Sequence, residues 1–114
     1  TQMFFDNKAY FDFLEKCKKL NIDIPIIPGI KPIATKKQLT VLPKIFHIDI
    51  PEALADAVEK AKDDKQVKEI GIEWAIQQCK ELKAAGVPVL HFYTMGRSEA
   101  TKAIAQQVFW WYIT

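Results

Sequence analysis

Apolar positions along the chain switch between helical spacing and short continuous runs. Four early residues recur at the i, i+3, i+4, i+7 spacing that predicts one buried helix face: Tyr10, Phe13, Leu14 and Cys17. Residues 24–27 then form a continuous apolar run, typical of a strand buried on both faces, which Pro28-Gly29 should end. Residues 89–93 predict a second complete strand, and residues 1–5 predict the end of another.

Two short helices are predicted between these strands. Thr35 and Gln38 have the spacing of a capping box, which predicts a helix over about residues 36–42. Pro43 should end or kink this helix, because proline has no N–H and clashes with the preceding turn. A further helix is expected over residues 52–62.

A long helix should follow a polar break at Asp63-Asp64 and run to about residue 85. Its apolar stripe lies along one side: Val67, Gly71, Trp74, Ala75, Gln78, Cys79 and Leu82. Gly86 suits the position that ends a helix, since glycine accepts left-handed backbone angles. Ser98 can cap the last helix.

The order of elements predicts an α/β fold. Strands that alternate with helices imply right-handed crossovers and a parallel sheet. Two complete strands and one strand end correspond to a quarter to a third of a (β/α)₈ TIM barrel. We therefore interpret residues 1–114 as a segment of one barrel domain. The two extra helices between residues 30 and 64 are the kind of elaboration that lies over an active face.

Composition narrows the classes of protein further. The 114 residues are 49% hydrophobic and 26% charged, and 16 Lys and Arg against 14 Asp and Glu leave a formal net charge of +2. This balance disfavours a nucleic-acid partner, and no apolar run is long enough for a membrane span. Cys17 and Cys79 show no metal-ligand spacing and are interpreted as small buried hydrophobes. We expect no metal site, no export signal and a cytoplasmic location.

Three polar side chains are candidate ligand contacts, because the ends of parallel strands carry the chemistry in such barrels. Gln2 and Gln38 offer amides, and Arg97 offers a planar, charged fork. Each has a simpler interpretation. Gln38 can return a hydrogen bond to the Thr35 backbone, which the spacing favours, while Gln2 can bond only to backbone and Arg97 can be solvated. His91 is interpreted as a structural histidine with satisfied hydrogen bonds.

The chain as a whole also resembles a known family. Four segments in order carry the resemblance: Thr1-Gln2-Met3-Phe4-Phe5-Asp6, residues 26–33 (Ile-Ile-Pro-Gly-Ile-Lys-Pro-Ile), Gly71-Ile72-Glu73, and Gly86-Val87-Pro88 followed by His91-Phe92-Tyr93-Thr94. They resemble the C-terminal part of methylenetetrahydrofolate reductase over nearly all 114 residues. The resemblance implies a (β/α)₈ barrel that holds FAD, of which this chain supplies the end of strand six through helix eight.

The resemblance also implies roles for the three candidates. Gln2 matches a glutamine that contacts folate and the reduced nicotinamide, Gln38 matches a folate-contacting glutamine, and Arg97 matches a folate-binding arginine. Two positions depart from the family pattern. Leu42 stands where several members carry an aromatic that stacks on the ligand, and Gly96 stands where many carry asparagine.

The implied reaction passes hydride from NAD(P)H to FAD and then to 5,10-methylenetetrahydrofolate, giving 5-methyltetrahydrofolate for methionine synthesis. The family's general-acid glutamate and most flavin contacts belong to strands one to five, so no catalytic residue is expected here. The chain alone should be inactive, and the full-length enzyme should be a homo-oligomer. The alternative is a self-standing, non-catalytic α/β domain that binds a protein through Trp110-Trp111.

Overall fold

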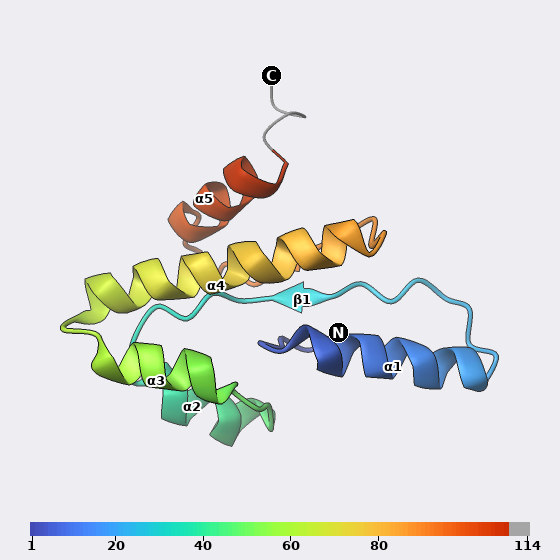
Figure 1. Cartoon of the computed structure of the whole chain (residues 1–114), viewed down its shortest axis with the longest axis horizontal. Helices are drawn as coiled ribbons and strands as arrows, with labels where there is room; N and C mark the ends of the chain where they lie inside the picture. Colours follow the sequence, from blue (N-terminus) through green and yellow to red (C-terminus); the bar gives the residue numbers. More distant parts are fainter. Residues whose placement is uncertain (110–114) are drawn as a thin grey trace.

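The computed structural model describes residues 1–109, so the predicted Trp110-Trp111 surface lies outside the described residues. Five helices and two short strands follow one another along this part of the chain (Figure 1): α1 (Asn7–Lys19), β1 (Gly29–Ile30), α2 (Gln38–Phe46), α3 (Glu52–Lys60), α4 (Asp64–Ala84), β2 (His91–Phe92) and α5 (Glu99–Val108). No helix among the described residues is long and apolar enough to cross a membrane.

The sheet is small and parallel, as the element order predicts. β1 pairs in parallel with β2, with Gly29 opposite His91 and Ile30 opposite Phe92. On its other side β1 receives a parallel bridge between Met3 and Gly29. β1 therefore lies between two parallel neighbours, one from the start of the described chain and one from near its end.

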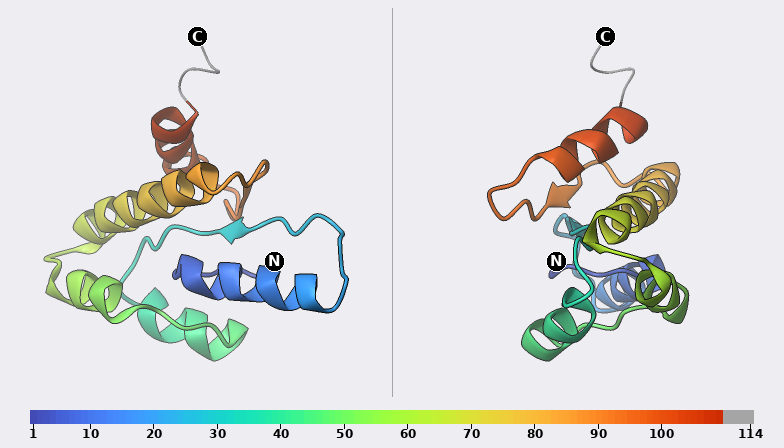
Figure 2. Two further views of the ribbon diagram at one scale, coloured as in Figure 1. Left: turned by 45° about the vertical axis from the view of Figure 1, so that its right-hand side comes forward. Right: turned by 90° about the vertical axis from the view of Figure 1, so that its left-hand side faces the viewer.

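The helices pack around this central strand. α4 contacts α1, α3 and α5, so it joins these three helices. Figures 1 and 2 show α2 and α3 near the end of the molecule toward which β1 runs, while α5 lies on the far side of α4 from them. The two helices inserted after β1 thus lie near the carboxyl end of the central strand.

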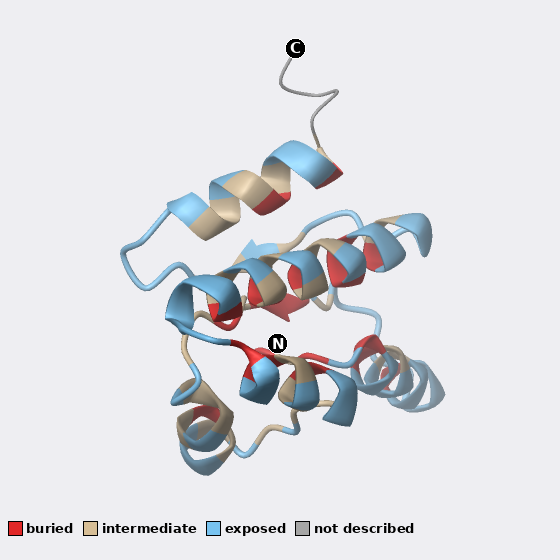
Figure 3. Cartoon of the chain, turned by 60° about the vertical axis from the view of Figure 1, so that its left-hand side comes forward, coloured by how far each residue is buried: buried red, intermediate tan, exposed pale blue. Residues whose placement is uncertain are grey.

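Two apolar clusters occupy the interior. The helix cluster packs α1, α4 and α5 against the sheet: Tyr10, Ile30, Ala75, Cys79, Leu82, Ile104 and Val108. The insertion cluster packs α2, α3 and the start of α4 against the other face: Met3, Phe5, Ile33, Leu42, Leu54, Val58, Ala61 and Val67. Buried positions line the sides of the helices that face one another and the sheet (Figure 3).

Side chains alternate between these clusters along each strand, as pleating requires. Met3 belongs to the insertion cluster, whereas its neighbour Phe4 packs on the helix cluster. In the same way Phe92 packs on the helix cluster and Tyr93 packs on the insertion cluster. The sheet consequently has one face toward α1, α4 and α5 and one face toward the inserted helices.

The long helix was predicted well. Its buried positions are six of the seven predicted stripe residues, all except Trp74, which is half-buried and donates a hydrogen bond of 2.7 Å from Nε1 to the Phe5 carbonyl. Asp63 caps its start by accepting from the Gln66 N–H. Gly86 follows its end with a φ of 89°, and this prediction is confirmed.

Gly71 allows the closest approach between a helix and a strand segment. A Cβ at this position would lie 1.9 Å from the Ile33 carbonyl oxygen, well inside any allowed contact. Without that atom, the chain leaving β1 packs directly on α4. Gly71 therefore sets the distance between α4 and the segment that leads to α2.

A buried polar pair joins α1 to α4. The Asn7 side-chain amide donates to the Gln78 carbonyl at 3.1 Å, and Gln78 Nε2 donates to Asn7 Oδ1 at 3.2 Å and to the Phe4 carbonyl at 3.1 Å. Both side chains are buried and hydrogen-bonded, which removes the cost of burying unpaired amides. The pair holds α1 beside the first strand segment.

The strand prediction for residues 24–27 is wrong. Ile24 is 65% exposed and Ile27 is 42% exposed, and the paired residues are instead Gly29 and Ile30. Pro25 interrupts the apolar run with a residue that cannot donate to a ladder. The sheet also needs a residue without a side chain at its centre, which places the pairing at Gly29.

Three smaller predictions also need correction. α2 passes through Pro43 and ends at Phe46, because the proline removes one donor without preventing the following turn. Phe13 is 47% exposed, so the buried face of α1 is narrower than the periodicity predicts. His91 is exposed and makes an edge contact with the Tyr93 ring at 5.0 Å between centroids. Its side chain makes no hydrogen bond with another described residue, so the prediction of a structural histidine with satisfied hydrogen bonds is wrong.

Candidate functional site

The candidate site lies where parallel strand segments and the inserted helices present polar groups. Gln2 precedes the Met3 bridge, Arg97 follows β2, and Gln38 begins α2 after β1. All three predicted residues thus belong to segments joined to the same small sheet.

Gln2 is exposed beside the edge of the sheet. Its Oε1 accepts a hydrogen bond of 3.1 Å from the Met3 N–H, which orients the side chain through its own backbone neighbour. The amide nitrogen makes no hydrogen bond with any residue in the range 1–109. Gln2 can therefore offer a donor to a ligand while its oxygen stays bound to backbone.

Gln38 is the most firmly held of the three. Its Oε1 accepts from the Ala34 N–H at 2.7 Å and from the Thr35 N–H at 3.3 Å. This confirms the bond to the Thr35 backbone that the capping-box spacing favours. Thr35 does not return the bond, because Lys37 occupies the N-cap position and no side chain caps α2.

Arg97 lies in a tight turn after β2. Its N–H donates to the Thr94 carbonyl at 2.9 Å, and Met95 and Gly96 both have positive φ angles, 53° and 82°. Glycine at position 96 relieves strain that most residues would meet at that angle. The Arg97 side chain is exposed and forms no ion pair with another described residue.

The predicted capping role of Ser98 is wrong in part. Ser98 occupies the N-cap position of α5, but its side chain makes no capping hydrogen bond. Its backbone angles are helical rather than extended, so its hydroxyl does not reach the N–H groups of the first turn. The turn before α5 is instead closed by the backbone bond between residues 94 and 97.

The structure brings two of the three candidate segments together through Tyr93. The Tyr93 hydroxyl donates to the Thr1 carbonyl at 2.8 Å, which links the segment before Gln2 to the strand before Arg97. A Cβ on Gly29 would lie 2.6 Å from the Tyr93 ring and 2.7 Å from the Thr1 oxygen, so Gly29 provides the room for this contact. No hydrogen bond within the described residues joins Gln38 to either of the others.

Tyr93 and Gly29 were not predicted to position the site. The sequence did contain a signal for each residue, because a tyrosine ends the second apolar strand and a glycine follows the first apolar run. Their contact depends on the parallel register of segments far apart in the chain. Leu42, which departs from the family pattern, is 4% exposed within the insertion cluster and presents little surface to a ligand.

Titratable groups near the helices do not form a catalytic cluster. Burial raises the pKa of the Cys79 thiol to about 12, which confirms the prediction of a small buried hydrophobe rather than a nucleophile. Cys17 is also buried and free. No group of three or more His, Cys, Asp or Glu side chains among residues 1–109 could hold a metal ion.

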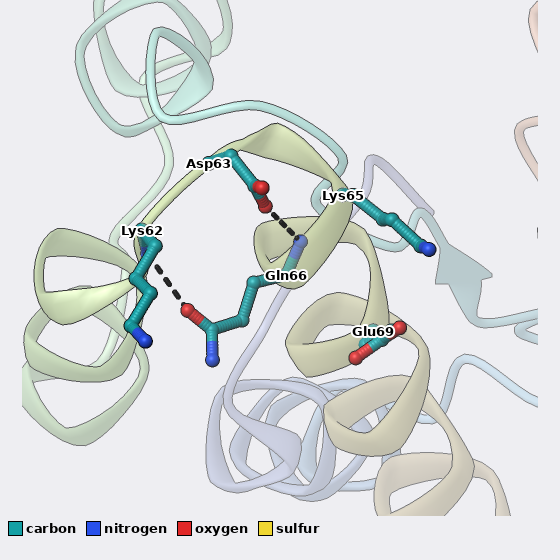
Figure 4. A pocket seen from close by; sticks show the side chains of 5 residues that line it. All are labelled: Lys62, Asp63, Lys65, Gln66 and Glu69. Atoms are coloured by element: carbon teal, nitrogen blue, oxygen red, sulfur yellow. Dashed lines mark hydrogen bonds between the residues drawn. The ribbon is translucent and has the colours of Figure 1, made fainter.

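A shallow hollow at the start of α4 has a structural explanation. It has a volume of about 190 Å³ and a charged lining (Figure 4): Lys62, Asp63, Lys65, Gln66 and Glu69. Gln66 Oε1 accepts from the Lys62 N–H at 2.7 Å while the Gln66 N–H donates to Asp63 at 2.9 Å. These bonds cap the helix, and none of the three predicted site residues lines the hollow.

The fold and the candidate site define an α/β protein with a parallel sheet and candidate polar side chains on the segments joined to its strands. Residues 1–109 match the family model described as methylenetetrahydrofolate reductase. The chain belongs to the methylenetetrahydrofolate reductase family, as the resemblance in the sequence implies.

Relatives from several kingdoms support this assignment. The chain is 36% identical over 109 residues to methylenetetrahydrofolate reductase 1 of Schizosaccharomyces pombe, covering 95% of this chain and 18% of the relative. It is 35% identical over 105 residues to 5,10-methylenetetrahydrofolate reductase of Escherichia coli, covering 91% of this chain and 36% of the relative. The chain therefore spans between about a fifth and about a third of the length of these relatives.

A solved structure has the same fold. It is a protein from Clostridium thermocellum described as binding two copies of 5-methyl-5,6,7,8-tetrahydrofolic acid. The TM-score is 0.64 at 23% identity, and the match covers 100% of this chain and 43% of that chain. This similarity supports the arrangement of helices and strands described above.

Proposed function

We propose that this chain is the folate-binding, C-terminal portion of a methylenetetrahydrofolate reductase. On this proposal it supplies the end of strand six through helix eight of a (β/α)₈ barrel, in a cytoplasmic, homo-oligomeric enzyme. The observation that carries the proposal is the family match over residues 1–109. The central position of β1 between two parallel neighbours supports the barrel assignment.

The three site residues have the chemistry that a reduced folate requires. A pterin ring both donates and accepts hydrogen bonds, and a folate tail carries carboxylates. The amide oxygens of Gln2 and Gln38 accept from backbone N–H groups, and their amide nitrogens make no hydrogen bond with another described residue, so both can donate to a ligand. Arg97, which follows β2, adds a planar, charged guanidinium group that suits a carboxylate or a pterin edge.

The proposed reaction also uses FAD and NAD(P)H. When bound, the flavin would supply the hydride transfer between the nicotinamide and the folate. The described residues fit the hydrogen-bonding edge of a pterin or nicotinamide, but they contain no glycine-rich phosphate loop for a dinucleotide. We therefore assign to this chain the orientation of the substrate, with Gln2 also facing the nicotinamide, and to other parts of the family's barrel the grip on the flavin.

A ligand titration tests the proposal. Calorimetric titration of the purified chain with 5-methyltetrahydrofolate should show saturable binding. A double variant, Gln2→Ala with Arg97→Ala, should bind more weakly. Gln77→Ala, an exposed glutamine on α4, is the matched control and should bind like the parent chain. Absence of folate binding to the parent chain, or equal binding by the double variant, would overturn the proposal.

A further inference from the structure

Lys31 is a cation at the carboxyl end of the central strand. It follows β1 directly, before the chain turns toward α2. In parallel α/β sheets this end of the strands is where ligands bind. Lys31 also lies within residues 26–33, one of the segments that carry the family resemblance.

The register of the sheet places Lys31 on the face of the insertion cluster. Gly29 pairs with both Met3 and His91, and Ile30 points to the helix cluster. The next residue along a strand points to the opposite face. Lys31 therefore shares a face with Met3 and Tyr93, opposite the face on which α1 and α5 pack.

Aromatic residues flank this position on both neighbouring segments. The ladder continues past the paired residues, because the Tyr93 N–H donates to the Ile30 carbonyl at 2.9 Å. Lys31 lies one residue beyond the Ile30–Phe92 pair, level with Tyr93, and two residues beyond the Met3–Gly29 bridge, level with Phe5. Phe5 is almost fully buried and Tyr93 is half-buried, so the lysine stem lies along apolar surface.

The ammonium group has no anionic partner in this setting. The ion pairs among residues 1–109 are Lys8 with Asp12 and Lys68 with Glu99, and neither involves Lys31. Burial lowers the pKa of Lys31, because partial loss of water disfavours the charged form without a counter-charge to offset it. A half-buried cation of this kind is stabilised when an anion binds beside it.

We propose that Lys31 is an anion-binding residue of the ligand site, and that its ammonium group holds a carboxylate or phosphate of the bound ligand. This inference rests on the proposed function, in which this chain orients a folate and the same enzyme also binds FAD. The carboxylate would come from the glutamate tail of a folate, and the phosphate from FAD. Both are oxyanions that a lysine binds as a point charge.

Matched pairs of ligands distinguish the two sources. Dissociation constants are measured by calorimetry for the parent chain and for Lys31→Met, using 5-methyltetrahydrofolate, 6-methyltetrahydropterin, FAD and riboflavin. The second ligand lacks the glutamate tail of the first, and the fourth lacks the phosphates of the third. Lys37→Met is the control, because Lys37 is an exposed lysine on the same connection to α2.

We expect a loss of affinity only for a ligand that carries an anionic group. Lys31→Met should weaken one of the two anionic ligands by about tenfold and leave its neutral counterpart unchanged. Lys31→Arg should retain most of the affinity, and Lys37→Met should change it by less than about twofold. Lys31→Gln repeats the test with a polar side chain, and thermal melts verify that each variant is folded.

The contrary outcomes distinguish a failure of the role proposed for Lys31 from a failure of the proposed function. If the parent chain binds 5-methyltetrahydrofolate and every Lys31 variant binds all four ligands equally well, the role of Lys31 is overturned and the proposed function stands. If the parent chain binds FAD through Lys31 but no folate, the folate assignment falls while the role of Lys31 stands. Equal losses in Lys31→Met and Lys37→Met, or no binding of any ligand, would overturn the proposal for Lys31.

Discussion

Gly71→Ala should destabilise the chain although it replaces glycine in the middle of a helix. In an unobstructed helix interior this substitution stabilises by about 1 kcal/mol, because alanine loses less backbone entropy than glycine. Here the new Cβ would lie 1.9 Å from the Ile33 carbonyl oxygen and 2.8 Å from its carbon. These are backbone atoms, so no rotamer change can relieve the contact, and α4 or the Ile33 segment has to move.

The expected magnitude follows from these opposing effects. Overpacking a well-filled interior costs about 1–3 kcal/mol, and a contact with backbone belongs at the upper end of that range. After the helix gain of about 1 kcal/mol is subtracted, the net loss is about 2 kcal/mol. For a domain of this size the melting temperature should fall by roughly 8 °C.

Urea unfolding followed by circular dichroism measures this change directly. Gln77→Ala, on the exposed side of the same helix, is the control and should alter stability by less than about 0.5 kcal/mol. The shift should appear in the midpoint rather than in the slope of the transition. A Gly71→Ala chain as stable as the parent, or more stable, would refute the close approach of α4 to Ile33.

Three further outcomes are expected. Gln78→Leu should lower the free energy of unfolding, measured in urea, by about 2–4 kcal/mol, because the Asn7 amide oxygen and the Phe4 carbonyl lose their buried donor. An unchanged free energy of unfolding would mean that water reaches both groups. Cys79 should resist a thiol reagent at pH 8 until the chain unfolds, and rapid labelling of the native chain would contradict its burial. The stabilising effect of Cys79 should decline as the pH rises from about 9 to about 12, because the thiol of the unfolded chain ionises at a lower pH than that of the folded chain. Arg97→Ala should weaken 5-methyltetrahydrofolate binding about tenfold by calorimetry, with partial recovery in Arg97→Lys, and unchanged affinity would identify Arg97 as a solvated loop residue.

The helices were predictable from local sequence because their determinants are local. The apolar stripe of α4 extends over many turns, and Asp63 and Gly86 mark its two ends. The strands were harder to locate, because the most apolar run, residues 24–27, is not the paired segment. Pairing falls on Gly29, and the reason is a contact with Tyr93 that no local pattern contains.

In the candidate site, too, local contacts were predictable from the sequence and contacts between distant segments were not. The bond from Gln38 to the Thr35 backbone was predictable from a spacing of three residues. The link between Tyr93 and Thr1 joins residues 92 positions apart, so it depends on the sheet register and could not be predicted from spacing. Gln2 and Arg97 could be named as candidates from the family resemblance, whereas the contact that brings their segments together required the structure.

The two apolar clusters divide the described part of the chain into two packing units. α2 and α3 contribute only to the insertion cluster, whereas α1 and α5 contribute only to the helix cluster, and α4 belongs to both. Local unfolding follows such boundaries, since a segment can open without exposing a cluster to which it does not contribute. The inserted helices can therefore detach while α1, α4 and α5 stay packed, which would uncover the face that carries Lys31 and Tyr93 without global unfolding.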